Sequence, residues 1–287
     1  MIIAKNKAEI RSARVNFLER KVAFVPTMGG LHRGHFMLMQ EARKAVGKEG
    51  IVVVSIFLNP MQFNNPKDLE TYPSTLETDL SGCEEEGVDI VFTPQADVVY
   101  KPDASVKVTE GVLSTTLCGA TRPGHFDGVC TVVLKLYNLV QPDVMLFGEK
   151  DFQQLAIIQR MVRDLDIPVE ILPVDTVRDQ RGVALSSRNA RLTPQALEDA
   201  PIIYQSLQKL AGLLASGEKS PIEARTYMES CFSSLRAQTK IDYLEVVDAE
   251  TMQALSTING REAILAIAVF FDGIRLIDHV TVLASEL

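Results

Sequence analysis

The feature that most constrains the fold is an alternation of two hydrophobic periods up to about residue 173. Short apolar runs rich in β-branched residues predict buried strands at 22–27, 51–57, 88–93 and 144–147. Stretches with helical spacing of apolar residues predict helices at about 35–46, 74–86, 127–140 and 151–164. The spacing of Ser74 and Glu77 fits a capping box, which predicts a helix start at Ser74. Because parallel strands need crossover connections, the alternation predicts an α/β fold with a Rossmann-like, doubly wound parallel sheet.

The rest of the chain has a different pattern, which predicts a second domain. Thr193 before Pro194 predicts a helix that starts there and runs to about residue 215, and a second helix is expected at about 221–235. Strand-like runs follow at 241–247, 263–271 and 274–283. We therefore expect a smaller C-terminal α+β domain over residues 181–287, after a Rossmann-like domain over residues 1–180.

Charge and hydropathy exclude several classes of protein. The 287 residues include 29 basic and 37 acidic side chains, and the formal net charge of −8 argues against a general nucleic-acid binder. The apolar runs are shorter than the roughly 18 residues that a membrane span needs. Charges at Lys5, Lys7 and Glu9 come before a signal peptide's apolar region could form. We expect a cytoplasmic protein without a nucleic-acid or membrane partner.

The cysteines suggest buried, reduced thiols. No two of them form a CxxC pair, so neither a zinc site nor a disulfide framework is predicted. They are Cys83, Cys118, Cys130 and Cys231.

The most informative segment is the glycine-rich run at 26–35, between a predicted strand and a predicted helix. Open α/β sheets bind ligands at this edge, and a helix N-terminus offers N–H groups to a phosphate. The run is not a Walker A loop, because His35 stands where that loop has lysine. His32 and His35 can donate hydrogen bonds to phosphate oxygens during attack on phosphorus. The alternative is a glycine-rich turn with incidental histidines, but two of the chain's four histidines fall here.

Two further polar clusters follow predicted strands. Asn59 and Gln62 carry paired donors and acceptors that suit a hydroxy acid, although an ordinary turn is the commoner explanation of Asn-Pro. Lys150 could hold a phosphate, Asp151 could accept from ribose hydroxyls, and Gln154 lies about one turn further on. A capped helix with solvated charges explains this second cluster equally well.

A serine-rich loop follows the predicted sheet. The hydroxyls of Ser186 and Ser187 and the guanidinium of Arg188 are suited to gripping a triphosphate or a departing pyrophosphate. A helix cap is the commoner role of such serines. The chain has neither GxSxG nor HExxH, which argues against common hydrolases and metalloproteases.

Taken in order, PTMGGLHRGH, FLNPMQF, RPGHFDGV, GEKDFQQ and LSSRN resemble the motifs of the pantoate–β-alanine ligase family. HRGH also resembles the HxGH element of the wider nucleotidyltransferase superfamily. The resemblance implies an AMP-forming acid–amine ligase that adenylates D-pantoate with ATP and releases pyrophosphate. The amine of β-alanine then displaces AMP to give pantothenate. It further implies Mg²⁺ on the triphosphate, a homodimer, and a C-terminal domain that closes over ATP.

The same resemblance assigns roles to residues at matching positions. Those that serve the phosphates in catalysis are His32, His35, Lys150, Ser186 and Arg188. Those expected to bind the nucleotide are Pro26, Thr27, Met28, Gly34, His35, Gly148, Lys150, Asp151, Val177, Leu185, Ser186, Ser187 and Arg188. Those expected to bind the other substrates, or to lie beside them, are Asn59, Gln62, Tyr72 and Gln154. No side chain is expected to ligate a metal. Gly30 and Arg33 depart from the family pattern, which leaves their effect on ATP affinity open.

Three other functions compete with this one. Another HxGH nucleotidyltransferase with a phosphorylated acceptor is the first alternative, but such an acceptor would favour arginine or lysine over Asn59, Gln62 and Gln154. The second is a non-catalytic nucleotide-binding module, which the retained histidines and Lys150 disfavour. A tRNA synthetase is least favoured, because the acidic chain shows no RNA-binding domain.

Overall fold

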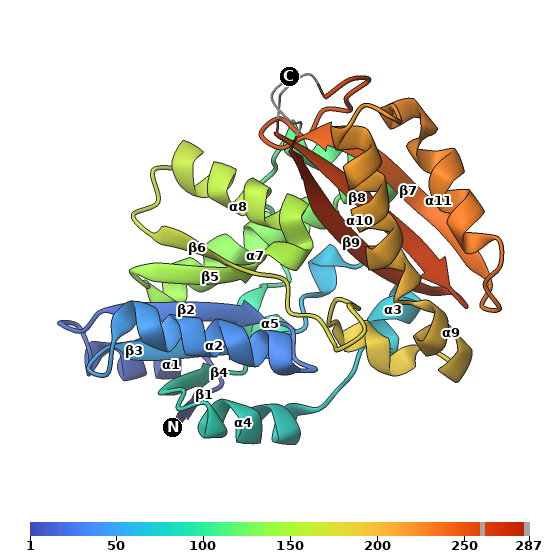
Figure 1. Ribbon diagram of the computed structural model, residues 1–287. Helices are drawn as coiled ribbons and strands as arrows, with labels where there is room; N and C mark the ends of the chain where they lie inside the picture. Colours follow the sequence, from blue (N-terminus) through green and yellow to red (C-terminus); the bar gives the residue numbers. More distant parts are fainter. Residues whose placement is uncertain (259–261, 284–287) are drawn as a thin grey trace. The chain divides into compact units, whose positions relative to one another are not determined.

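The computed structural model describes residues 1–258 and 262–283. The chain forms two units (Figure 1). The first unit contains residues 1–110, 123–149 and 157–177. The second contains residues 111–122, 150–156 and the described chain from Arg178 onward. One division lies between Val177 and Arg178, near the expected boundary, while two short earlier segments belong to the second unit. The assignment of functional domains to 1–180 and 181–287 stays a prediction.

The first unit contains the predicted parallel sheet. Its strand order is β1-β4-β3-β2-β5-β6, and all neighbours are parallel. The strands are β1 (Ile2–Ala4), β2 (Val22–Thr27), β3 (Ile51–Ile56), β4 (Ile90–Phe92), β5 (Val144–Gly148) and β6 (Glu170–Val174). The chain winds outward from β2 through β3 and β4, and in the other direction from β5 to β6. The order therefore reverses between β2 and β5, and such a switch point is where these sheets bind ligands.

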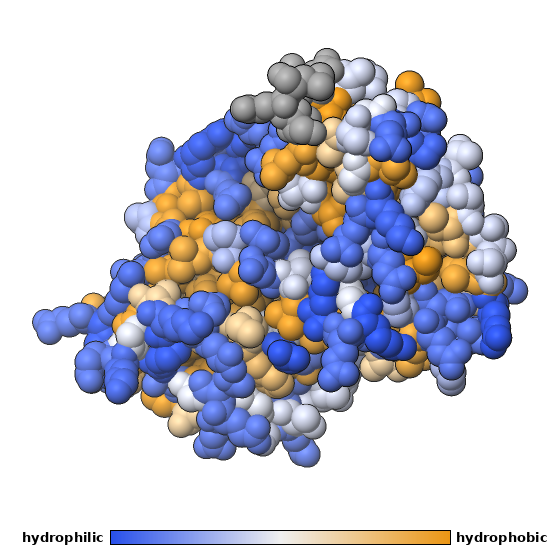
Figure 2. All heavy atoms as spheres, viewed as in Figure 1, coloured by the Kyte–Doolittle hydropathy of each residue, from blue (hydrophilic) through white to orange (hydrophobic). Residues whose placement is uncertain are grey.

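Both faces of this sheet are buried. Successive side chains of a strand point to opposite faces, and in β2 both Val25 and its neighbour Phe24 are fully buried. Val25 packs with Met39 of α2. In Figure 2 mostly hydrophilic residues cover the side of α2 that faces the viewer. The unit's helices are α1 (Lys7–Val15), α2 (Arg33–Val46), α3 (Pro66–Glu70), α4 (Leu76–Glu85), α5 (Ala96–Val99) and α7 (His125–Val140).

Helix α4 does not start as the sequence predicts. Its N-cap residue is Thr75, and no side chain caps the helix, so the predicted capping box at Ser74 is wrong. The Thr75 hydroxyl instead donates to both carboxylate oxygens of Asp79, at 3.1 Å each. The helix therefore starts with a hydrogen-bonded pair of Thr75 and the buried Asp79, one turn later, and not with the predicted pair of Ser74 and Glu77.

The second unit contains an antiparallel three-stranded sheet covered by helices, which confirms the predicted α+β pattern. Its strands pair in the order β7-β8-β9. They are β7 (Thr239–Asp248), β8 (Glu262–Phe271) and β9 (Ile274–Leu283). Leu207 and Leu210 of α10 (Ile202–Ala215) and Met228 of α11 (Ala224–Phe232) are completely buried in the core beside this sheet. Its shorter helices are η2 (Leu113–Thr115), α6 (Leu117–Thr121), η4 (Ser187–Arg191), α9 (Pro194–Asp199) and η5 (Pro221–Glu223).

The helix predicted from Thr193 starts correctly but is shorter than expected. Thr193 caps α9 by accepting a hydrogen bond from the Ala196 N–H, with Pro194 in the first turn. The helix ends at Asp199, and α10 begins after Pro201. Proline lacks the N–H that a continuous helix needs and clashes with the carbonyl four residues earlier, so one predicted helix becomes two.

Two expectations about the whole chain can be compared with the structure. Cys83, Cys118 and Cys130 are buried and Cys231 is half-buried, and all four are free thiols. Within residues 1–258 and 262–283, no helix is both long and apolar enough to cross a bilayer.

Candidate active site

The glycine-rich run forms a tight loop between β2 and α2. Gly29 and Gly30 have φ angles of +86° and +63°, a left-handed conformation that favours glycine. Thr27 anchors the start of the loop, because its hydroxyl donates to the Ser55 carbonyl of β3 at 2.7 Å. The loop therefore leaves the sheet at the carboxyl end of β2, beside the switch point.

The two histidines of the loop cap α2 reciprocally. The Gly34 N–H donates to His32 Nδ1 at 3.1 Å, and the His32 N–H donates to His35 Nδ1 at 3.2 Å. Their ring centroids are 4.1 Å apart. Because each Nδ1 accepts a backbone hydrogen bond, each neutral imidazole carries its hydrogen on Nε2. The pair thus offers two Nε2–H donors at a helix N-terminus, where the helix dipole favours an anion.

The position of the His32 ring at the start of α2 requires glycine at position 34. A Cβ atom at Gly34 would lie 2.9 Å from the His32 ring and 3.9 Å from Cβ of Val177. Val177, at the end of the first unit, therefore lies beside the start of α2, and its role in binding the nucleotide stays a prediction.

A buried amide network follows β3. Asn59, only 1% exposed, caps the short helix η1 (Pro60–Gln62). Its Nδ2 donates to Gln62 Oε1 at 3.0 Å and to the Gly128 carbonyl at 3.1 Å, and its Oδ1 accepts from the Tyr100 hydroxyl at 2.8 Å. These contacts fix the orientation of both amides. The Gln62 oxygen faces Asn59, so the Gln62 amide group presents its N–H side in the other direction.

Other motif residues hold this network in place. His125 Nδ1 donates to the Gln62 carbonyl at 2.7 Å. A Cβ at Gly128 would lie 2.5 Å from the Met61 carbonyl oxygen, so α7 can pack against η1 only with glycine there. The Tyr72 ring lies edge-on to Phe63, with centroids 5.9 Å apart, which places Tyr72 beside the end of η1. The RPGHFDGV motif therefore supports the amide pair.

Tyr100 contacts the amide pair through Asn59 but was not identified from the sequence. It lies 41 residues from Asn59 in the chain, outside every motif considered. Burial raises the pKa of Tyr100 to about 12, so its hydroxyl stays protonated and remains a donor to Asn59 at neutral pH. Only contact information at long sequence separation could have identified it.

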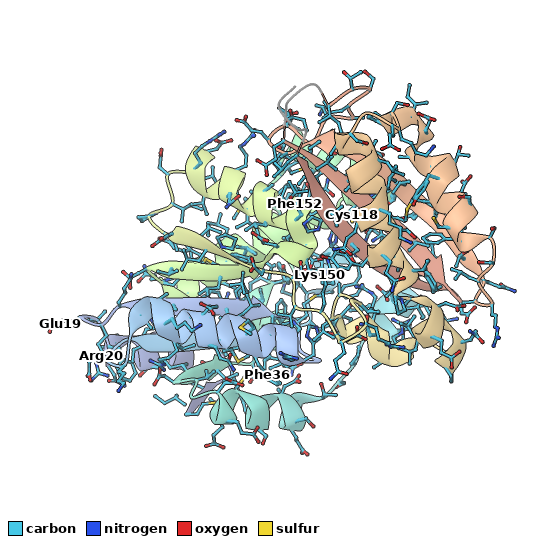
Figure 3. The ribbon with its side chains drawn as sticks, in the orientation of Figure 1. Glu19, Arg20, Phe36, Cys118, Lys150 and Phe152 are labelled. Atoms are coloured by element: carbon cyan, nitrogen blue, oxygen red, sulfur yellow. The ribbon has the colours of Figure 1, made fainter. Side chains whose placement is uncertain are left out.

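In the second unit, Lys150, labelled in Figure 3, and Asp151 lie in η3 (Glu149–Asp151), immediately before α8 (Phe152–Asp164). Lys150 Nζ and Asp151 Oδ2 are 3.6 Å apart, and the Lys150 side chain is 18% exposed. Gln153 is buried and structural, since its amide bonds the Cys118 N–H and the carbonyls of Leu113 and Thr116. Gln154, which the family resemblance assigns to pantoate binding, is half-buried.

The serine-rich loop forms the short helix η4. Ser186 is its N-cap, and its Oγ accepts from the Arg188 N–H at 3.2 Å. Leu185, Ser186, Ser187 and Arg188 are all half-buried. Ser186 therefore has the helix-capping role that the sequence analysis left open, and this role places its hydroxyl beside the Arg188 backbone.

His279, on β9, was not singled out by the sequence patterns. Its ring lies against Phe152, labelled in Figure 3, with centroids 5.2 Å apart. Burial lowers the pKa of His279. The carboxylates of Asp278 and Asp151 raise this pKa, whereas the positive charges of Arg178 and Lys150 lower it further. The only sequence signal was that histidine is rare in this chain.

The lowered pKa of His279 predicts a pH effect on stability. As the pH falls through the ordinary value of 6.5, the unfolded chain takes up a proton at His279 that the folded chain binds only at lower pH. This group therefore contributes full stability above pH 6.5 and progressively less below it. His279→Gln should lose less free energy of unfolding than the wild type between pH 7 and pH 5, as measured by urea denaturation. Equal losses in the two proteins would contradict the assignment.

The predicted site residues thus fall into two sets, each placed within its own unit. The first unit holds Pro26, Thr27, Met28, His32, Gly34, His35, Asn59, Gln62, Tyr72, Gly148 and Val177. The second holds Lys150, Asp151, Gln154, Leu185, Ser186, Ser187 and Arg188. In the first set, the ends of the adjacent strands β2, β3 and β5 bring the histidine loop, the segment containing the amide pair and Gly148 to one edge of the sheet.

Comparisons with known proteins identify the family to which the chain is related. The family described as pantoate–β-alanine ligase matches residues 2–281. A pantothenate synthetase of Akkermansia muciniphila is 50% identical over 276 residues, covering 96% of this chain and 97% of the relative. One from Leptospira biflexa is 43% identical, covering 97% and 98%.

Solved structures show the same likeness. A pantothenate synthetase of Thermus thermophilus has a TM-score of 0.88 at 41% identity, covering 99% of this chain and all of the other. A pantoate–β-alanine ligase of Francisella tularensis, solved in complex with β,γ-ATP and β-alanine, has a TM-score of 0.80 at 33% identity, covering 100% and 99%. This chain belongs to the pantoate–β-alanine ligase family.

Proposed function

We propose that this chain is an ATP-dependent ligase that condenses D-pantoate with β-alanine, giving pantothenate, AMP and pyrophosphate through a pantoyl adenylate. The observation that carries the proposal is the reciprocal capping of α2 by His32 and His35. It presents two Nε2–H donors and a helix N-terminus at the switch point of the sheet, and it does so within a chain of this ligase family.

In the first step the pantoate carboxylate attacks the α-phosphorus of ATP and pyrophosphate leaves. Both reactants are anions, so the protein must supply donors and cations around phosphorus. His32 and His35 donate to phosphate oxygens from Nε2, and the charges of Lys150 and Arg188 stabilise the pyrophosphate that departs. Because the imidazoles already carry hydrogen on Nε2, they act as donors in the neutral form.

In the second step the neutral amine of β-alanine attacks the acyl carbon, the bond from that carbon to the phosphate oxygen breaks, AMP leaves and the nitrogen releases one proton to solvent. The Gln62 amide, oriented by Asn59, donates to pantoate and holds its carbonyl carbon in place. Gln154 supplies a second amide for the same substrate. Positioning of this kind contributes more than covalent catalysis here, because the mixed anhydride is already activated.

Mg²⁺ belongs to this proposal as a companion of ATP. In the part of the chain that the structure describes, no three His, Cys, Asp or Glu side chains gather to hold a metal. The absence of such a group in the described residues fits an ion held mainly by triphosphate oxygens and water. Bound there, Mg²⁺ would neutralise charge on the triphosphate.

The family resemblance of the sequence also supports a cytoplasmic homodimer and a C-terminal domain, residues 181–287, that closes over ATP. Closure would protect the acyl adenylate from water. Sedimentation should give twice the mass of one chain. ATP with pantoate should slow proteolytic cleavage near residue 180, and unchanged cleavage would argue against closure.

The direct test is to mix the protein with Mg-ATP, D-pantoate and β-alanine, and to omit each in turn. Pyrophosphate release should need pantoate but not β-alanine, and pantothenate should appear only with β-alanine. Pyrophosphate release without pantoate would favour another nucleotidyltransferase. ATP binding without turnover would favour a non-catalytic module.

The amide network predicts a substrate-specific effect of Tyr100→Phe. The variant removes the Tyr100 donor to Asn59 Oδ1 but keeps the ring, and only the Met61 N–H, at 3.3 Å, still donates to that oxygen, so the Gln62 amide loses part of its orientation. A lost hydrogen bond of this kind corresponds to about a 3- to 10-fold rise in KM for pantoate. KM for ATP should stay unchanged. Tyr137→Phe, a matched hydroxyl deletion on α7, is the control, and equal changes in both variants would contradict the role of Tyr100.

A further inference from the structure

We propose that Asp79 is a positioning residue for the adenylation step, because its carboxylate holds the glycine loop that carries His32. The inference rests on the proposed function, since it concerns the loop that would bind the phosphates of ATP. Asp79 lies on α4, outside the sequence motifs, and does not need to contact a substrate to act in this way.

The contacts of Asp79 are directed at the loop. The residue is 3% exposed. Oδ2 accepts from the Gly30 N–H at 2.9 Å, and Oδ1 accepts from the Leu31 N–H at 2.8 Å. The Thr75 hydroxyl donates to both oxygens from the other side. One buried carboxylate thus satisfies two successive N–H groups immediately before His32.

The backbone N–H groups of the glycine loop need a hydrogen-bond acceptor. Gly29 and Gly30 adopt left-handed φ angles, so the backbone turns sharply, and the N–H groups of Gly30 and Leu31 both point toward Asp79. Buried N–H groups without an acceptor are strongly unfavourable, and the loop has no strand or helix of its own to satisfy them. A Cβ at Gly29 would lie 3.1 Å from Asp79 Oδ2, which shows how closely the loop is drawn over the carboxylate.

Helix packing keeps the carboxylate at this distance. The Phe36 ring of α2, labelled in Figure 3, packs against α4, because a Cβ at Gly82 would come within 2.7 Å of that ring. Gly82 is one turn from Asp79, and Phe36 is one turn from His32. The direct contact between α2 and α4 therefore sets how far the carboxylate can reach and where the loop must sit.

The geometry distinguishes positioning from direct phosphate binding. A carboxylate repels the phosphates of ATP, so Asp79 would be unfavourable in this region if its oxygens faced them. Both oxygens instead accept from the loop and from Thr75. The carboxylate thereby fixes the direction of the His32 and His35 donors without adding a group to the phosphate site.

Asp79→Asn tests this role with little change of volume. The amide keeps one acceptor and turns an NH₂ group toward the second N–H, so one loop contact is lost. Since small misplacements of reacting groups can lower rates about 100-fold, single-turnover adenylate formation should fall by about that factor, with a raised KM for ATP. The KM for β-alanine should not change. The matched control is Glu77→Gln, which removes an exposed carboxylate from the same helix and should have no effect.

Amide hydrogen exchange gives a readout independent of the reaction. Exchange at Gly30 and Leu31 should be slow in the wild type and at least tenfold faster in Asp79→Asn. Unchanged exchange and adenylation would overturn the proposal, whereas an inactive wild type would count against the proposed function alone. If Asp79→Asn does not fold, Thr75→Val decides, because it removes the exposed donor that orients the carboxylate. It should raise KM for ATP and speed exchange at Gly30, and no change in either would overturn the proposal.

Discussion

His32→Asn should form pantoyl adenylate about 100- to 1,000-fold more slowly than the wild type while keeping its stability. Asparagine is among the best N-cap residues, so its Oδ1 can accept the Gly34 N–H that His32 Nδ1 now accepts. It cannot supply the Nε2–H donor. The loss of one preorganised donor to a transition-state oxygen has an effect of this size.

The capping and chemical roles of His32 can be separated by a second variant. His32→Ala should lose the same factor in rate and also about 1 kcal/mol of stability, because its side chain no longer caps α2. Rapid-quench measurement of adenylate and urea denaturation check the two effects separately. Adenylation at nearly the wild-type rate in His32→Asn would show that the cap, and not the imidazole, is what the loop requires.

The elements that carry His32 could be predicted because they are formed by residues close together in the sequence. A strand of β-branched residues, a glycine-rich turn and an amphipathic helix are consecutive in the chain, so the period and turn chemistry of 22–46 define them locally. His32, Gly34 and His35 lie within one helical turn, where spacing alone determines which groups meet. The same reasoning located Asn59 with Gln62, and Thr193 with Pro194.

Features that depend on distant partners could not be predicted in this way. Asp79 reaches loop residues 48 and 49 positions earlier, and Tyr100 reaches Asn59 across 41. These contacts follow from helix and strand packing, which single-sequence patterns do not describe. The wrong capping box at Ser74 has the same cause, because the competing hydrogen bonds involve Asp79, whose other partners are in the loop. β1 escaped prediction because three residues are too few to show a period.

The two units also differ in what their sequences reveal. In the first, a strand order that reverses between β2 and β5 identifies the binding edge by topology alone. In the second, Lys150 and Ser186 lie at short helix starts that resemble ordinary caps. The sequence pattern alone therefore does not establish the chemical roles of Lys150 and Ser186, and measurements such as the following one are needed.

Lys150→Ala should reduce adenylate formation about 100-fold or more with an unchanged KM for β-alanine. The ammonium group is a point charge near the start of α8, and its 3.6 Å distance to Asp151 is longer than a hydrogen bond, so the pair does not lock it in place. In the proposed step it neutralises the charge that develops on the departing pyrophosphate. Removing that cation leaves Asp151 as an unbalanced negative charge beside an anionic ligand, which adds to the loss.

The control for Lys150 is a lysine with a similar ion pair and no proposed role. Lys219 lies in the same unit, with Nζ 3.7 Å from Glu223 Oε1, and Lys219→Ala should leave the rate unchanged. Lys150→Arg should recover only part of the rate, because a planar guanidinium does not reproduce a compact ammonium. If Lys150→Ala instead forms adenylate at the wild-type rate but releases pantothenate slowly, then Lys150 acts on the amine transfer, and stabilisation of pyrophosphate must come from Arg188.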